Sequence, residues 1–190
     1  MNAVVTTLLI ILAVLALLVL GGWYLLKLSR RPVLEINLYP TEGKKWRNAE
    51  KAAEWSKWFL KNDFEPAGTF ECWEMPYIII SGYVRPSDQM IGALCEHAEA
   101  GIWIDIGVQY ENGDGLTVSN APSGGSLDPM PGQTKFYLKE GSPDEILVKA
   151  ITERRPTGRV AGAKGEFAFF FEEQYRREMK WRLGRGGPTP

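Results

Sequence analysis

IWIDIGVQY, the segment Ile102–Tyr110, is followed after Glu111 by the turn Asn112–Gly115 with the letters NGDG. Apolar side chains occupy every second position of Ile102–Tyr110, and the positions between them carry Trp103, Asp105, Gly107 and Gln109. A period of two predicts a strand with one apolar face. Asn-Gly and Asp-Gly tolerate positive φ and are strong hairpin signals, so Leu116–Ser119 is expected to return antiparallel.

Further short runs on both sides of this hairpin predict more strands. Met90–His97 is ambiguous between a strand and a short helix. Before it, strands are expected at Val33–Tyr39, Gly68–Trp73 and Tyr77–Val84, and after the hairpin at Lys135–Leu138. Residues 120–132, rich in Pro, Gly, Ser and Asp, predict one long loop.

Three segments have helical periodicity. The first is expected to begin at Thr41 or Glu42 and to run to Lys61, because its apolar residues recur at helical spacing. The second is expected at 142–154, where Ser142 is an N-cap, a proline follows, and acidic residues lie in the first turn. The third is expected at 164–183, with an apolar stripe of Phe167, Phe170, Phe171, Tyr175 and Met179. One helix, an antiparallel sheet and two further helices predict a single α+β domain over residues 32–190.

An apolar run precedes this domain. Val4–Leu26 contains no charged residue, and its 23 residues would span roughly 34 Å as a helix at 1.5 Å per residue. The hydrocarbon core of a bilayer is about 30 Å thick, so the run predicts an N-terminal transmembrane helix, with residues 1–31 as anchor and basic flank. A cleaved signal peptide fits less well, because no basic residue precedes the run and bulky Trp23 and Tyr24 follow Gly21-Gly22.

The charges beside the run predict its direction. Lys27, Arg30 and Arg31 follow it, whereas its N-terminal flank has no basic residue. The positive-inside rule therefore predicts a single-pass cell-membrane protein whose N-terminus lies outside and whose globular domain is cytoplasmic. Residues 4–26 are expected to contact membrane lipid.

The composition excludes some classes of function. With 22 basic and 23 acidic residues the chain is almost neutral, which argues against nucleic acid as a partner. Two cysteines, Cys72 and Cys95, are too few for a disulfide-stapled secreted fold, although one bridge between them stays open. No cofactor motif is present.

Catalytic candidates are few. Cys95 and His97 would share a face of an extended strand, and a thiolate beside an imidazole is the arrangement of cysteine nucleophiles. His97 is the only histidine, so a serine hydrolase would also need it; the loop serines Ser119, Ser123 and Ser126 lack the G-x-S-x-G context. Packing and turn roles explain these residues better, and no catalytic residue is assigned.

Other constellations have structural explanations. Cys72, Cys95 and His97 lack the paired spacing of zinc ligands, so no metal site is predicted. Ser123–Ser126 lacks the lysine and the strand–loop–helix context of a phosphate loop. Asn112 and Asp114 fit turn chemistry better than a calcium loop. Nothing in the sequence pairs the carboxylates Glu71, Glu74, Asp105, Glu172 and Glu173.

Two features indicate contact surface. Trp55 and Trp58 lie partly off the apolar stripe of the first helix, and tryptophan is enriched at binding hot spots. The last helix carries several basic residues, among them Arg177 and Arg182, and Trp181 lies between these two in the sequence. Cations at a helix C-terminus stabilise its dipole, which explains their position without a ligand, and contact with anionic lipid beside a membrane is the alternative.

These features predict an accessory or scaffold protein that binds a partner protein or a larger membrane complex through its cytoplasmic domain. The expected contact residues are Trp55, Trp58, Arg177, Trp181 and Arg182. The alternative is a membrane-tethered hydrolase that uses Cys95 or a loop serine with His97.

Overall fold

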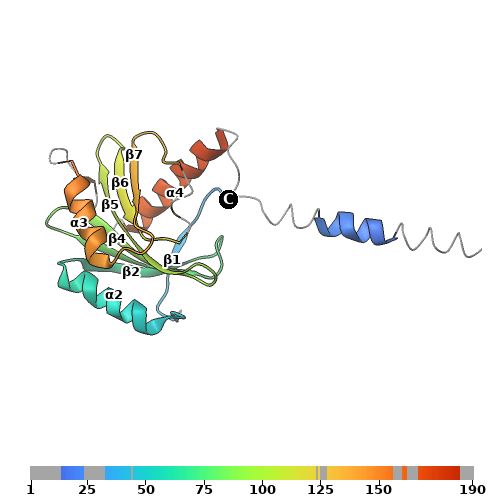
Figure 1. Ribbon diagram of the computed structural model, residues 1–190, viewed down its shortest axis with the longest axis horizontal. Coiled ribbons are helices and arrows are strands. Elements are labelled where there is room, and N and C mark those ends of the chain that lie inside the picture. The colour runs from blue at the N-terminus through green and yellow to red at the C-terminus, as the bar shows by residue number, and fades with distance from the viewer. Residues whose placement is uncertain are drawn as a thin grey trace, which may run out of the picture.

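A computed structural model describes residues 14–23, 33–43, 45–122, 124, 128–155, 160–161 and 167–184. Figure 1 shows one sheet with helices on both sides of it. Seven strands lie in the order β1-β2-β3-β4-β5-β6-β7, and β8 pairs with β5. The strands are β1 (Leu38–Pro40), β2 (Glu65–Cys72), β3 (Ile78–Arg85), β4 (Met90–His97), β5 (Gly101–Tyr110), β6 (Gly115–Ser119), β7 (Gln133–Tyr137) and β8 (Val160–Ala161). The helices are α2 (Ala49–Lys61), α3 (Pro143–Glu153) and α4 (Phe167–Gly184).

The β5–β6 hairpin follows the sequence prediction. Ile104, Ile106 and Val108 are buried on one face of β5, and the residues between them are more accessible. Gly113 has φ +84°, which a residue without a side chain adopts at no steric cost. The ambiguous segment Met90–His97 is a strand, paired antiparallel with both β3 and β5.

The prediction of an antiparallel sheet is wrong, because the sheet is mixed. β7 pairs in parallel with β6, with Gly115 opposite Gln133 and Ser119 opposite Tyr137. Parallel neighbours need a connection that carries the chain back along the sheet, which a tight turn cannot provide. The loop predicted between Ser119 and Gln133 is that return connection.

The predicted transmembrane helix is also corrected. Of residues 4–26 the structure describes only 14–23, which are helical, and the remainder lies outside the described residues. Ten helical residues are about 15 Å long, roughly half of a hydrocarbon core. Within the described ranges, no helix has both the length and the apolar character needed to cross a bilayer. The side chains of 14–23 are exposed, among them Leu17, Leu18 and Val19.

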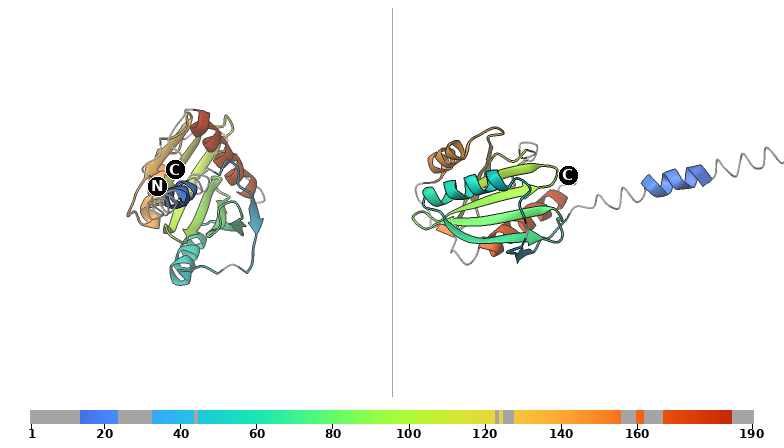
Figure 2. Two further views of the ribbon diagram at one scale, coloured as in Figure 1. Left: turned by 90° about the vertical axis from the view of Figure 1, so that its right-hand side faces the viewer. Right: turned by 90° about the horizontal axis from the view of Figure 1, so that it is seen from below.

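The two faces of the sheet have separate cores. α2 and α3 cover one face, where Phe59 and Ile146 are fully buried, and α4 covers the other with Phe167 (Figures 1 and 2). α2 precedes β2–β7 and α3 and α4 follow them, as expected. A glycine lies beneath the main aromatic ring of each face. A Cβ atom on Gly92 would lie 2.4 Å from Phe59, and one on Gly82 would lie 2.4 Å from Phe167.

Helix α2 begins later than predicted, at Ala49 rather than near Thr41. Asn48 is its N-cap and accepts a hydrogen bond from the Lys51 backbone N–H at 3.2 Å. Glu96 of β4, buried and distant in sequence, accepts the backbone N–H groups of Arg47 at 2.7 Å and of Asn48 at 2.8 Å. A tertiary contact therefore stabilises the start of this helix. The local periodicity of the sequence does not reveal such a contact.

The start of α3 is as the sequence predicts. Ser142 and Glu145 form a capping box, in which the Ser142 side chain accepts from the Glu145 backbone N–H and the Glu145 carboxylate accepts from that of Ser142. Trp58 Nε1 of α2 donates to Asp144 Oδ1 of α3 at 2.7 Å, so the two helices on this face are joined directly.

Candidate ligand cavity

A cavity of about 210 Å³ lies between the sheet and α4. We call it the α4 cavity. Its apolar lining includes Ile91, Ala93, Leu116, Phe170 and Phe171, and its polar lining includes Asp105, Thr117, Gln133, Lys135, Gln174 and Glu178. Gly107 and Gly115 also line it, and their missing side chains leave room over β5 and β6.

The cavity follows from the alternation in β5. The apolar face of that strand packs against α2 and α3, so Asp105, Gly107 and Gln109 point to the side that α4 covers. α4 carries aromatic residues that must be buried, but it meets a strand face with polar and small side chains. The two surfaces leave a space to which both the sheet and α4 contribute apolar and polar side chains.

Asp105 is one of the charged residues that line this space. Its carboxylate accepts a hydrogen bond from Trp103 Nε1 at 3.1 Å and another from the Ser119 hydroxyl. Burial raises the pKa of Asp105, and the nearby Glu178 carboxylate adds to that shift. The two hydrogen bonds and Lys135 act in the opposite direction, without cancelling the effect of burial.

Glu178 has the opposite environment. Its carboxylate accepts Lys135 Nζ at 2.6 Å and also pairs with the Arg182 guanidinium. All three side chains are at most 16% exposed. Burial disfavours the ionised carboxylate, but the two cations outweigh it and lower the pKa of Glu178. Two carboxylates in one cavity are thus held differently, one by two cations and one by neutral donors.

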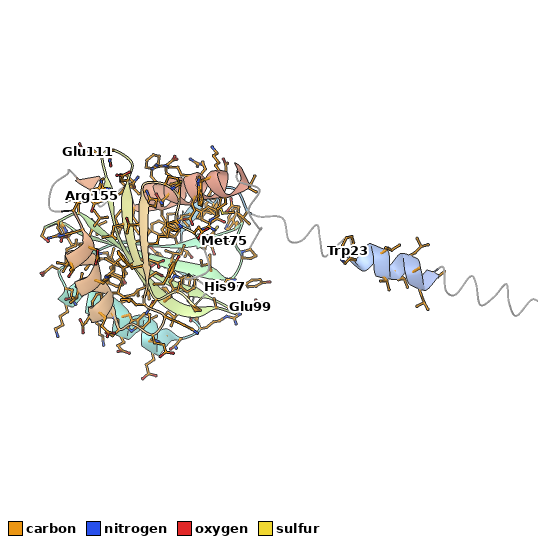
Figure 3. All side chains as sticks on the ribbon, turned by 45° about the horizontal axis from the view of Figure 1, so that its top comes forward. Trp23, Met75, His97, Glu99, Glu111 and Arg155 are labelled. Atoms are coloured by element: carbon orange, nitrogen blue, oxygen red, sulfur yellow. The ribbon has the colours of Figure 1, made fainter. Side chains whose placement is uncertain are left out.

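The candidate nucleophile Cys95 and the candidate base His97 form no hydrogen bond with each other in the described part of the chain. Cys95 is buried, and desolvation raises the pKa of its thiol well above the usual value, an effect that the Asp105 charge strengthens. The His97 Nδ1 atom accepts the backbone N–H groups of Glu99 at 3.2 Å and Ala100 at 3.4 Å, so it holds the β4–β5 turn. Figure 3 shows His97 and Glu99 together at one end of the domain.

The other chemical candidates have structural partners. Ser119 is buried and bonds to the Ala121 backbone N–H, whereas Ser123 and Ser126 lie outside the described residues. Cys72 and Cys95 are free thiols. The described part of the chain holds no group of three or more His, Cys, Asp or Glu residues arranged for a metal ion. The Asp114 carboxylate pairs with Arg155 at 2.7 Å and with Asn112 at 2.9 Å, in a turn.

The predicted contact residues are mostly engaged within the domain. Trp55 is buried, and Lys51 Nζ lies over it at 4.4 Å from the ring centroid. Trp58 donates a hydrogen bond to Asp144 of α3. Arg177 donates to the Gly113 carbonyl at 3.1 Å, and Arg182 pairs with Glu178. Trp181 is half-buried on α4. Their role in binding a partner stays a prediction.

Sequence reasoning placed Asp105 among several carboxylates but did not find Lys135, Gln174 or Glu178. Two sequence features could have indicated the cavity: the polar face of β5, and a later helix rich in aromatic residues whose packing partner was not predicted. They did not show that this helix covers that face. Comparisons of the chain with known protein families, with curated proteins and with solved structures found no match.

Proposed function

We propose that this domain binds a small molecule in the α4 cavity. The observation that carries the proposal is a concave, largely apolar space into which a few polar side chains converge, one of them a carboxyl group with a perturbed pKa. Ligand sites in proteins have this composition. Structural packing alone favours a filled interior, because empty space forfeits contacts between its walls.

The dimensions limit the ligand. About 210 Å³ is below the roughly 300–1,000 Å³ typical of sites for drug-sized molecules. The ligand is therefore a compact molecule with an apolar part against Phe170 and Phe171 and a polar part towards Asp105 and Thr117. A molecule of about ten non-hydrogen atoms binds with Kd values in the millimolar to micromolar range.

Filling the cavity tests the proposal. Gln174 is a half-buried lining residue on α4, so Gln174→Trp places an indole in the space that a ligand would occupy. We expect the affinity for the neutral probe 2-phenylethanol, measured by NMR titration of the full chain, to fall about tenfold, which is a change of about 1.4 kcal/mol.

The matched control for this variant is Lys57→Trp, an exposed position on α2 across the sheet, which should bind the probe as the unaltered chain does. Equal binding by Gln174→Trp and the unaltered chain, or perturbed resonances elsewhere in the domain, would contradict the proposal.

A second candidate function is the binding of a partner protein, as in an accessory or scaffold protein. The supporting observation is an exposed aromatic pair at the β1 edge of the sheet. Tyr39 stacks on Trp73 with ring centroids 4.3 Å apart, and Trp73 is 69% exposed. Tyr77, on the same β2–β3 turn as Trp73, is 66% exposed. Exposed aromatic side chains of this kind are common anchors of interfaces.

This second function predicts the effect of Trp73→Ala. A partner that co-purifies with the full chain in a mild extract should be lost from Trp73→Ala and retained by the control Leu60→Ala, which alters an exposed residue of α2. Truncating an interface anchor costs about 2 kcal/mol or more, roughly a thirtyfold loss of affinity. Equal retention by both variants would count against this surface.

A further inference from the structure

The polar side chains of the α4 cavity differ in how many of their hydrogen bonds and ion pairs are already formed within the protein. Glu178 is bonded to Lys135 and Arg182. Gln133 Nε2 donates to the Gly113 carbonyl at 3.1 Å, and the Tyr175 hydroxyl donates to the Val33 carbonyl at 3.0 Å. These groups are held in place by the fold.

Asp105 has acceptor capacity left. An ionised carboxylate has about four lone-pair sites, and the Asp105 carboxylate receives hydrogen bonds from Trp103 and Ser119. Both donors are neutral. In the described part of the chain no cation forms an ion pair with Asp105, since the amine of Lys135 is bonded to Glu178. Asp105 is therefore the lining charge that lacks a direct counter-ion.

The arrangement of charges in the lining indicates what is missing. Asp105, Lys135 and Glu178 are its charged members, and both nearby cations, Lys135 and Arg182, are paired with Glu178 rather than with Asp105. A bound anion would face the carboxylates of Asp105 and Glu178. The cation of the lining, Lys135, is already paired with Glu178. A bound cation would complete the pairing of Asp105 in a site where desolvation strengthens such an interaction.

We propose that the α4 cavity takes a small primary amine, with its ammonium group on the Asp105 carboxylate and its apolar body against Ala93, Phe170 and Phe171. The inference rests on the proposed ligand-binding function and names the chemical class of the ligand. The ammonium group has three donors, which match the two unused acceptor sites of Asp105 and the Thr117 hydroxyl on the neighbouring strand.

The inference also predicts a pH dependence. The titratable or charged groups that act on Asp105 or respond to its charge are Lys135 and Tyr137 of β7, Glu178 of α4 and Cys95 of β4. Because burial raises the pKa of Asp105, this group takes up a proton at a higher pH than an ordinary aspartate does as the solution is acidified, and a protonated carboxyl group does not pair with an ammonium ion. Amine affinity is expected to rise with pH until Asp105 is fully ionised.

The test compares three probes of similar shape on the full chain by NMR titration: 2-phenylethylamine, 2-phenylethanol and 3-phenylpropanoate. We expect the amine to bind at least tenfold more tightly than the alcohol, and the carboxylate to bind most weakly. Asp105→Asn should remove the advantage of the amine, so that the variant binds the amine no more tightly than it binds the alcohol. The control Asp63→Asn changes an exposed carboxylate in the α2–β2 turn, and it should bind all three probes as the unaltered chain does.

The outcomes separate the two proposals. If the alcohol binds in the cavity as tightly as the amine, or if the carboxylate binds best, the amine assignment is wrong and the ligand-binding function stands. If none of the three probes perturbs the cavity resonances, both proposals fail. The comparison of amine and alcohol uses the unaltered chain, so it decides the matter even if Asp105→Asn does not fold.

Discussion

Replacing Phe59 with alanine is expected to lower the free energy of unfolding by about 3–5 kcal/mol. The Phe59 side chain is fully buried between α2 and the sheet. Its ring stacks on Tyr83 with centroids 4.2 Å apart and meets Phe64 edge-on at 5.1 Å. Alanine would lose these contacts and leave a cavity over Gly92, where no side chain is available to fill it. Urea unfolding followed by tryptophan fluorescence measures the change.

The neighbouring residue provides the control. Leu60 lies on the same helix and is 53% exposed, so Leu60→Ala should change the stability by no more than about 0.5 kcal/mol. Domains of this size are stable by about 5–15 kcal/mol, and the loss at Phe59 is a large part of that. A change at Phe59 as small as that at Leu60 would show that this face of the sheet is not packed as described.

The second large effect is expected at Glu178. Glu178→Ala leaves Lys135 and Arg182, which are 13% and 14% exposed, without their shared carboxylate. Removing one member of a buried ion pair costs about 3–5 kcal/mol, and we expect about 3 kcal/mol here because some solvent reaches the site. Glu153→Ala is the control, because its pair with Lys149 is 35% exposed on both sides and contributes about 0.3–0.5 kcal/mol.

The effect at Glu178 should depend on pH in one direction. Its pKa in the folded state lies below the ordinary value of 4.5, since Lys135 and Arg182 outweigh the effect of burial. A carboxyl group with a lowered pKa contributes stability that is fully present above its pKa in the unfolded state and is lost as the pH falls through its folded pKa. The stability difference between the unaltered chain and Glu178→Ala should therefore be constant near neutral pH and should shrink below about pH 4.5. A difference that grows on acidification would contradict the described pairing.

Part of the fold was predictable because it depends on neighbours in the sequence. The alternation of Ile102–Tyr110 predicted which face of β5 is apolar, and the buried residues Ile104 and Ile106 confirm it. The turn at Gly113 and the N-cap at Ser142 were also predictable, because backbone conformation and capping are decided within a few residues.

Other parts depend on contacts between distant residues. The parallel pairing of β6 with β7 requires a return connection whose direction no local pattern states. The start of α2 depends on Glu96, which lies nearly fifty residues further along the chain. The burial of Trp55 follows from where α2 packs, although its position on the helix alone left it open as a contact residue.

The sequence by itself determined the hairpin, the N-cap of α3 and the apolar face of β5, because hydrophobic periodicity and turn chemistry act over a few residues. Only the tertiary structure decided that α4 covers the polar face of β5, and so brought Asp105, Lys135 and Glu178 into one cavity. The reason is that the position of a helix on a sheet is set by the joint packing of side chains from distant segments, and none of those segments specifies it alone.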